Sequence, residues 1–436
     1  MHRRDFIARS SAALAGLMVP DILKAESPVP AKKNESDGRI RVGLIGCRSM
    51  GWGDYAEFFK FPEADCVALC DIDEGVLQKR AADFEDKTGK KPKLFSDYRK
   101  MLADKDIDAV VIGTPDHWHC LMTCDALAAG KHVYVEKPLA NTIAECEIME
   151  AYAQHYGKVV QVGQQQRSGL IWQEMKKYLD SGRLGRIAKV NVWANFQYAS
   201  ILEAAPDCPP PAGVDFDMWL GPAPQRTFNP KRFHGSWRMF WDYGGGLVTD
   251  WGVHLLDMAL WGMNTASMPR RVMASGGNFA YPRNVAETFD TLSVIWEYDD
   301  FSIQWSNVAA AEAGPYGKAY GLEFCGTEGM LVANRDGWEV IPGKGSKLEP
   351  ASFQPDHKDR TNHVGNFLEC IRTGRLNTAC TMQNGSFCAK FAHLGNIAAR
   401  TRSVLTYDPA THSFGNAEAD RLLKPEYRAP WQFPKI

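Results

Sequence analysis

A short apolar segment and the glycine-rich turn after it constrain the fold of this chain more than any other feature. Residues 40–45 are apolar enough for a buried parallel strand, and the turn at residues 46–51 (GCRSMG) follows directly. A helical pattern comes next, and a second apolar segment, residues 66–70, leads to Asp71. Strand, glycine turn, helix, strand and acid in this order predict a dinucleotide-binding unit in a doubly wound parallel sheet.

The turn and the acid have separate roles in holding a dinucleotide. Glycines let the chain turn sharply, so that a pyrophosphate can approach the free N–H groups at the N-terminus of the following helix. We therefore assign Gly46, Met50 and Gly51 to cofactor binding. Asp71 lies 25 residues after Gly46, where it can accept from ribose hydroxyls and would repel a 2′-phosphate, which favours NAD over NADP. Arg48 replaces the middle glycine of G-x-G-x-x-G, so either the backbone path differs or the guanidinium turns to solvent or to a phosphate.

Three more apolar segments, residues 108–113, 132–135 and 159–162, alternate with helical patterns. A polar cluster follows each of them. Since ligands of open parallel sheets bind outside the carboxyl ends of the strands, we expect these clusters to meet at the cofactor. The residues assigned to it on this basis are Thr114, Pro115, Asp116, His119, Glu136 and Gln165.

The second half of the chain follows a different pattern. Residues 187–193, 291–298, 301–305 and 321–325 alternate as strands of an antiparallel sheet with one exposed face, of the kind that often forms a homo-oligomer interface. A long loop rich in Pro and Gly at residues 206–235 leads into aromatic residues interleaved with arginine, which suit a sugar ring and its hydroxyls. Most of these aromatics could equally cap the core. We expect Arg167, Arg238 and Tyr243 to contact the substrate.

These motifs resemble the Gfo/Idh/MocA oxidoreductases. The match rests on the glycine turn, on Thr114-Pro115-Asp116 with His119, on Glu136-Lys137-Pro138, and on Asp250 with His254. The resemblance implies an α/β protein, with a Rossmann domain followed by an α+β domain that carries a large open antiparallel sheet. We place these domains at residues 39–168 and 169–406, with a C-terminal tail at 407–436.

The resemblance also implies an activity. Most members transfer a hydride between nicotinamide and a secondary hydroxyl of a sugar, glycoside or cyclitol. Such a reaction needs a base for the hydroxyl proton and a partner for the developing oxyanion. We assign His254 as the proton acceptor, Lys137 as the oxyanion partner that can also share the proton, and Asp250 as the residue that positions the hydroxyl or His254. By itself, an Asp/His pair on a helix is more often a surface pair or a core histidine with its partners.

Three functions other than a dehydrogenase are consistent with parts of this pattern. A minority of the family hydrolyse glycosides by transient oxidation and elimination on bound NAD, and export from the cytoplasm would suit such a redox-neutral reaction. A non-enzymatic NAD-binding sensor would not need Lys137 and His254. A metal enzyme built on His117 and His119 lacks a second cluster at suitable spacing, so no metal is expected.

The N-terminal residues indicate a signal for export rather than a part of the folded domains. Arg3-Arg4 followed by an apolar pair and a small-residue exit is typical of a twin-arginine signal peptide, at residues 1–25, with a polar linker at 26–38. The expected location is therefore the periplasm or another compartment reached by export. The eleven cysteines form no C-x-x-C pair, and export of a protein folded in the reducing cytoplasm is compatible with buried thiols and a cofactor already bound. The net charge of −2 gives no reason to bind nucleic acid, and no apolar stretch is long enough for a membrane span.

Overall fold

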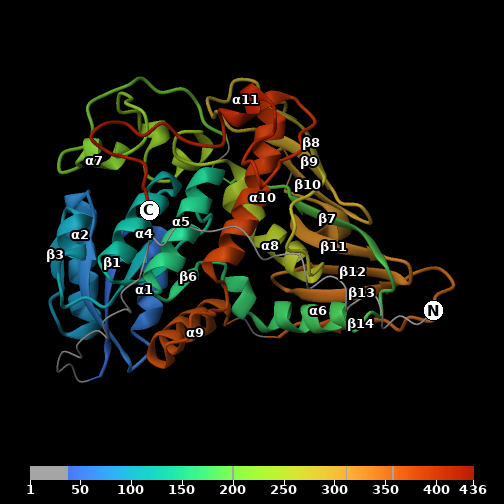
Figure 1. Cartoon of the computed structure of the whole chain (residues 1–436), viewed down its shortest axis with the longest axis horizontal. Coiled ribbons are helices and arrows are strands. Elements are labelled where there is room, and N and C mark those ends of the chain that lie inside the picture. The colour runs from blue at the N-terminus through green and yellow to red at the C-terminus, as the bar shows by residue number, and fades with distance from the viewer. Residues whose placement is uncertain (1–37, 199–200, 311, 356–357) are drawn as a thin grey trace, which may run out of the picture. The chain divides into compact units, whose positions relative to one another are not determined.

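The computed structural model of the chain describes residues 38–198, 201–310, 312–355 and 358–436 (Figure 1). The predicted signal peptide and nearly all of the predicted linker lie outside these residues. In the described part, no helix is long and apolar enough to cross a membrane.

The first sheet is parallel, with the strand order β3-β2-β1-β4-β5-β6. This is the order of the doubly wound dinucleotide-binding fold, so the predicted Rossmann sheet is confirmed. Its strands are β1 (Ile40–Ile45), β2 (Ala64–Cys70), β3 (Lys93–Phe95), β4 (Ala109–Ile112), β5 (His132–Val135) and β6 (Val160–Val162). The helices between them are α1 (Ser49–Phe58), α2 (Glu74–Thr88), α3 (Tyr98–Leu102), α4 (Asp116–Ala128) and α5 (Ile143–Tyr156).

Helix α4 begins earlier than the apolar pattern indicates. After the polar residues 114–119, the helical pattern begins at Leu121, but the structure begins α4 at Asp116. Pro115 is the N-cap residue and Asp116 lies in the first turn, where a carboxylate interacts favourably with the helix dipole. As a result, His117 and His119 lie on a buried helix and not in a loop at the sheet edge.

The second sheet is mostly antiparallel, as predicted, with the order β14-β13-β12-β11-β7-β10-β9-β8. Only β7 and β10 pair in parallel among its described strands. Its strands are β7 (Ile187–Ala194), β8 (Arg271–Gly277), β9 (Thr291–Glu297), β10 (Ser302–Val308), β11 (Tyr320–Gly326), β12 (Gly329–Asn334), β13 (Gly337–Pro342) and β14 (Ala351–Phe353). The α-helices that follow the first sheet in the described part of the chain are α6 (Leu170–Asp180), α7 (Phe216–Leu220), α8 (Val253–Gly262), α9 (Asp359–Thr373), α10 (Met382–Thr401) and α11 (Ala417–Asp420).

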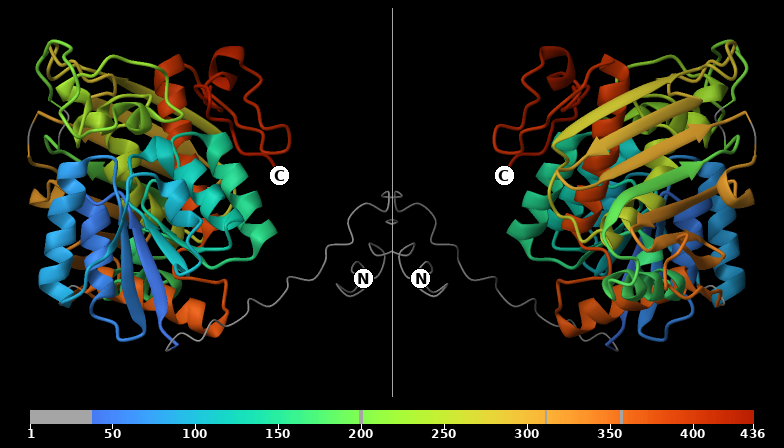
Figure 2. Two further views of the ribbon diagram at one scale, coloured as in Figure 1. Left: turned by 90° about the vertical axis from the view of Figure 1, so that its left-hand side faces the viewer. Right: turned by 90° about the vertical axis from the view of Figure 1, so that its right-hand side faces the viewer.

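Helices α8 and α10 pack against this sheet and bury its core (Figure 2). Trp296 of β9 stacks on Phe391 of α10, with ring centroids 4.3 Å apart. Alternate residues of β9 and β10 are buried while their neighbours are exposed or half-buried, which is the pattern of a sheet covered on one face. The homo-oligomer predicted from this sheet stays a prediction.

Helix α9 returns to the first sheet. Its residues Val364, Phe367 and Leu368 share one apolar core with Val42 and Leu44 of β1. The C-terminal tail packs on a different core of the first domain, where Trp431 lies edge-on against Trp118 of α4, with ring centroids 5.0 Å apart. The predicted domain boundaries stay predictions. All eleven cysteines lie in the described part, none forms a disulfide, and nine are buried.

Candidate active site

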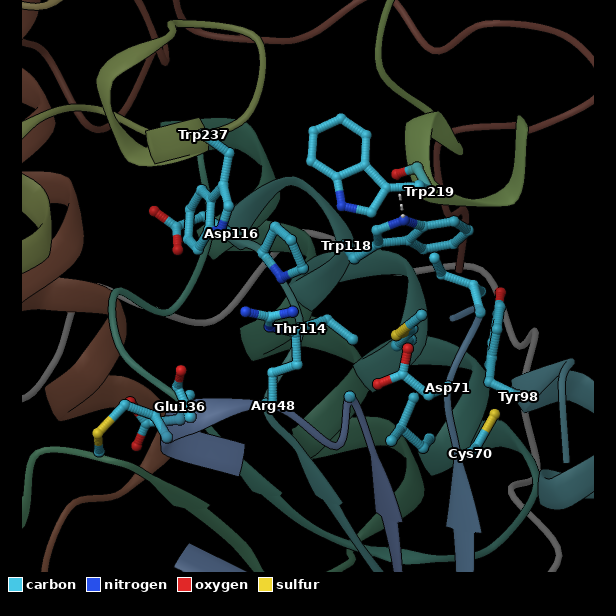
Figure 3. A pocket seen from close by; sticks show the side chains of 18 of the residues that line it. Arg48, Cys70, Asp71, Tyr98, Thr114, Asp116, Trp118, Glu136, Trp219 and Trp237 are labelled. Atoms are coloured by element: carbon cyan, nitrogen blue, oxygen red, sulfur yellow. Dashed lines mark hydrogen bonds between the residues drawn. The ribbon is translucent and has the colours of Figure 1, made fainter. Parts of the chain in front are cut away.

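A pocket lies at the carboxyl ends of β1, β2, β4 and β5 (Figure 3). The indoles of Trp118, Trp219 and Trp237 lie on the side of this pocket away from the strands. We call it the cofactor pocket. Predicted site residues that line it are Gly46, Met50, Asp71, Thr114, Pro115, Asp116, Glu136, Lys137 and Arg238.

Close backbone packing in the glycine turn leaves no room for a Cβ at Gly46 or Gly51. Gly46 has a left-handed backbone, with φ +87°, and a Cβ there would lie 2.8 Å from the carbonyl carbon of Gly113. Gly51 does not line the pocket; a Cβ there would overlap the carbonyl oxygen of Gly46. Helix α1 begins at Ser49 without a side-chain cap or an acid in its first turn, so its N–H groups are free to bind an anion.

Arg48 takes the middle glycine's place without strain. Its φ of −89° and ψ of 165° are ordinary for an L-amino acid, so the backbone path does not require glycine. Arg48 lines the cofactor pocket, and Figure 3 shows its guanidinium within that pocket. The sequence left open whether the backbone path differs or the guanidinium turns outward. The structure shows the second outcome, with the guanidinium directed into the space where a ligand would bind.

Asp71 is held by the backbone around it. The N–H of Cys47 donates to its Oδ2 (2.7 Å) and the N–H of Asp73 donates to its Oδ1 (3.0 Å). Burial raises the pKa of Asp71, and these two backbone donors oppose the shift by stabilising the ionised form. Each oxygen keeps a lone pair for a ribose hydroxyl.

One buried polar atom of a residue that lines the cofactor pocket, Oγ1 of Thr114, has no partner among the described residues. The carboxyl of Glu136, another lining residue, interacts with buried Asp54, and burial raises the pKa of both groups. A buried polar atom without a partner costs free energy, so a native protein tends to supply one. Together with the glycine turn and the free N-terminus of α1, the hydroxyl of Thr114 fits a bound dinucleotide.

The predicted catalytic residues meet beside this pocket. Nζ of Lys137 donates to Oδ1 (2.8 Å) and to the backbone oxygen (2.9 Å) of Asp250, and Nε of Arg238 donates to the same Oδ1 (3.0 Å). Burial raises the pKa of Asp250, but Lys137 and Arg238 lower it more, and the net shift is downward. Burial lowers the pKa of Lys137, but Asp250 and Glu136 raise it more, so Lys137 stays an ammonium ion.

Asp250 and His254 do not share the face of a regular helix. Residues Val248–Gly252 form a π-helical turn, and α8 begins only at Val253. The wider turn changes the side-chain spacing that the sequence implied. His254 is buried, and its Nδ1 has no partner in the described part of the chain. Burial first, and then the charges of Arg335, Lys137 and Arg360, lower the pKa of His254 well below 6.5, so the ring is neutral.

A second pocket, which we call the substrate pocket, adjoins the first. Lys137, Arg238 and Met50 line both pockets. His254, Trp251, Tyr198 and Arg335 line only the substrate pocket. The ammonium of Lys137 therefore lies where the two pockets meet, with the imidazole of His254 on the substrate side.

Four residues that the sequence assigned to cofactor or substrate binding have different contacts in the structure. His119 lines neither pocket: its Nδ1 lies 2.8 Å from the oxygen of Pro138 and its Nε2 lies 2.9 Å from that of Thr114, so it connects two loops. Gln165 lines the substrate pocket and donates to Oδ1 of Asp54 (2.8 Å). Tyr243 is fully buried in an aromatic cluster with Trp219 and His117. Its hydroxyl is therefore not presented to the substrate pocket.

Arg167 is the fourth of these residues. It forms a two-pronged ion pair with Asp257 of α8, at 2.7 and 2.8 Å, and lines neither pocket. The predicted substrate contact is therefore replaced by a structural pair. The sequence could not show this, because the partner carboxylate lies 90 residues away.

Replacing Arg167 with methionine should lower the free energy of unfolding by about 3 kcal/mol, because Asp257 is left buried without a cation. The KM for sugar should change little. Urea unfolding and steady-state kinetics measure the two effects. The matched control is Arg271→Met, which removes an exposed pair with Glu297 and should cost roughly 1 kcal/mol or less. A raised KM with unchanged stability would restore Arg167 to the substrate site.

Sequence reasoning missed several residues of both pockets. Trp118, Trp219 and Trp237 line the cofactor pocket, and Tyr198, Arg335 and Arg360 line the substrate pocket. Trp219 and Trp237 do lie within or just after the loop rich in Pro and Gly, but their aromatic character fitted a core equally well. Arg335 and Arg360 carry no motif, so no sequence signal identified them.

Comparison with known proteins decides the family. Residues 40–164 match the oxidoreductase family with an NAD-binding Rossmann fold, and residues 169–300 and 339–433 match that family's C-terminal α/β domain. The chain belongs to the Gfo/Idh/MocA oxidoreductase family. The nicotinamide cofactor expected from the glycine turn is therefore supported by the family's NAD-binding fold.

Among curated relatives, a "Glycosyl hydrolase family 109 protein" of Shewanella baltica is 32% identical over 162 residues. That match covers 34% of this chain and 35% of the relative, so the chain spans about a third of the length of the curated relatives it matches. Among solved structures, aldose-aldose oxidoreductase from Caulobacter crescentus has a TM-score of 0.64 at 20% identity, covering 84% of this chain and 99% of that one. A levoglucosan dehydrogenase complex with NADH and levoglucosan gives the same values. At this identity the two structures show the fold alone.

Proposed function

We propose that this protein is an NAD-dependent oxidoreductase that acts on a secondary hydroxyl of a sugar, glycoside or cyclitol. The observation that carries the proposal is the position of Lys137, whose ammonium lies where the cofactor and substrate pockets meet. The solved structures named above, one of them crystallised with NADH and a sugar, support the substrate class.

The residues around the junction divide the work of alcohol oxidation. Asp250 accepts two of the three N–H bonds of Lys137, through its side chain and its backbone oxygen, which leaves one N–H for the substrate oxygen. Because Lys137 stays charged, it stabilises the oxyanion as the proton leaves. Neutral His254, which lines the substrate pocket, is the group that can accept this proton. The bound nicotinamide supplies the hydride acceptor.

The cofactor's orientation follows from the pocket. Free N–H groups of α1 and the guanidinium of Arg48 would hold the pyrophosphate, and Asp71 would hold the ribose at the far end. Thr114 and Glu136 line the same pocket, and the buried hydroxyl of Thr114 has no partner among the described residues. Glu136 precedes Lys137 in the chain, so this end is the one that adjoins the substrate pocket.

The experiment that tests the proposal uses the purified protein with whatever nucleotide it retains. After denaturation, the released nucleotide is identified by mass spectrometry, and the intact protein is offered neutral and acidic sugars and their aryl glycosides. NADH or a keto-sugar with the glycosidic bond intact supports the oxidoreductase. Release of the aglycone without accumulation of NADH overturns it in favour of a glycosidase.

An NAD-dependent glycoside hydrolase is the second candidate, and the similarity to the glycosyl hydrolase family 109 protein favours it. Elimination requires an acid or base beyond those that serve oxidation. Tyr198 lines the substrate pocket and interacts with Asp250, and burial and this carboxylate raise its pKa. A phenol that stays protonated fits the role of an acid towards a leaving group.

Replacing Asp71 with serine should relax the choice of cofactor. The carboxylate repels a 2′-phosphate, so its removal is expected to tighten NADP(H) binding by about tenfold while weakening NAD(H) binding. Fluorescence titration of the nucleotide-free protein with both cofactors measures the ratio. Asp83→Ser on helix α2 removes a partly exposed carboxylate and serves as the control. An unchanged ratio in Asp71→Ser would show that Asp71 does not contact the ribose.

We also propose that the protein is exported to the periplasm by the twin-arginine route. The order of basic, apolar and small residues at the N-terminus supports this. Since this route carries folded proteins, the cofactor would be bound before export. Fractionation of cells that express the full chain tests the location.

A further inference from the structure

The substrate pocket has a surplus of positive charge. Six basic side chains line it, against the two carboxylates of Glu57 and Asp359. The six are Lys60, Lys137, Arg238, Arg335, Lys358 and Arg360. Lys60 is paired with Glu57 and Arg360 with Asp54, and Lys137 and Arg238 share Asp250. Arg335 and Lys358 are then set against Asp359, so the pocket suits a ligand with negative charge.

Arg335 is the most specific of these cations. It occupies the tip of the hairpin between β12 and β13, and the side chain of Asn334 braces this tip by bonds to the backbone and carboxylate of Asp336. Nε of Arg335 donates to the amide oxygen of Gln166 (3.1 Å), and its guanidinium stacks on Trp251, 4.4 Å from the ring centroid. None of the described carboxylates lies within ion-pair distance of it.

Arg335 therefore differs from other largely buried arginines of this protein, because it has no carboxylate partner among the described residues. Arg167 and Arg238, which are also largely withdrawn from water, each have a carboxylate partner that raises their pKa. For Arg335, burial lowers the pKa, and Asp359 and the phenol of Tyr320 compensate only in part. A cation kept out of water without an ion pair costs stability, and proteins tend to retain such costs where a ligand is bound.

Arg335 also lies close to the reacting groups. Trp251, on which it stacks, contacts the ring of His254, with centroids 5.9 Å apart. The charge of Arg335 is the largest electrostatic influence on His254. A sugar whose hydroxyl reaches Lys137 and His254 would thus have another substituent near the guanidinium.

We propose that Arg335 binds a carboxylate of the substrate, so that the enzyme acts on acidic sugars such as uronic acids in preference to neutral ones. Stacking on Trp251 holds the guanidinium in one plane, and its two terminal nitrogens can donate in parallel to both oxygens of a carboxylate. The remaining surplus charge of the pocket acts in the same direction. The inference rests on the proposed oxidation of a sugar hydroxyl and names the class of sugar.

The test compares matched pairs of probes on the NAD-loaded protein. D-glucuronate, D-galacturonate and D-mannuronate are offered beside the corresponding neutral sugars, and glucose 6-phosphate serves as a sugar with a different anion. Oxidation is followed as NADH formation or keto-sugar by mass spectrometry. We expect at least one uronate to exceed its neutral counterpart in kcat/KM by about tenfold or more.

Variants assign this preference to Arg335. Arg335→Gln should bring the ratio of uronate to neutral sugar close to one, and Arg335→Lys, which keeps the charge but not the fork, should give an intermediate ratio. Arg270→Gln removes an exposed guanidinium elsewhere and should leave the ratio as it is. Because Arg335 has no ion pair to lose, we expect Arg335→Gln to melt no lower than the parent protein. A lower melting temperature with an unchanged ratio would make Arg335 a structural residue.

The outcomes separate this inference from the proposed function. Neutral sugars oxidised as well as or better than uronates would overturn the inference and leave the oxidoreductase in place. Preference for the 6-phosphate over every uronate would overturn the carboxylate as the group recognised. If no sugar of either kind reduces the bound nucleotide, the proposed function and the inference both fail.

Discussion

Replacing Lys137 with methionine should lower kcat for sugar oxidation by about 10³- to 10⁴-fold. Methionine keeps the length of the side chain but removes the ammonium that faces the substrate oxygen, so the oxyanion loses its charged partner in a buried site. Asp250 keeps Arg238, which limits the loss of stability. The effect should fall on kcat more than on KM, because the oxyanion develops only in the transition state.

The measurement for Lys137→Met is the single-turnover rate of nucleotide reduction. Nucleotide content and melting temperature are recorded beside it to show that the pocket is intact. Lys177→Met on α6, where an exposed lysine pairs with Glu174, is the matched control and should turn over normally. Full turnover by Lys137→Met would remove Lys137 from the mechanism.

Replacing His254 with asparagine should lower kcat/KM by about 10³-fold and change its pH dependence. Only the neutral ring can accept the hydroxyl proton. Because the pKa of His254 lies well below 6.5, the ring remains neutral as the pH falls through 6.5, and protonates only in more acidic solution. The parent enzyme should therefore keep its oxidation rate at pH 6.5 and lose it below, whereas the residual rate of the variant should not show that acid limb.

A pH profile of kcat/KM for both proteins measures this difference. The low pKa has two causes, burial and the cations Arg335, Lys137 and Arg360. Arg335→Gln removes one of the cations and should move the acid limb of the otherwise intact enzyme towards higher pH. An acid limb at the same pH in His254→Asn and the parent would assign the base to another group.

Much of the fold could be predicted because its signals are local. The strand at residues 40–45 has the predicted bounds, since its apolar run and the glycine turn after it act within a few residues. The π-helical turn at Val248–Gly252 could not be predicted, because its backbone depends on tertiary packing.

The site was predictable where topology determines position. The carboxyl ends of parallel strands meet at one edge, so Asp71, Thr114 and Glu136 could be placed together without a structure. Orientation was not predictable. The sequence predicted that Arg167 and Tyr243 contact the substrate. In the structure, the carboxylate of Asp257 and an aromatic cluster hold these two side chains away from both pockets.

The central claim is that a secondary hydroxyl of a sugar gives its hydride to the nucleotide held beside Lys137. The most direct measurement is a single turnover with a sugar deuterated at its carbinol carbons, followed by denaturation and mass analysis of the nucleotide. The account predicts a reduced nucleotide that carries one deuterium, with a slower rate than for the unlabelled sugar. Recovery of only oxidised or unlabelled nucleotide, with the sugar chemically changed, would contradict it.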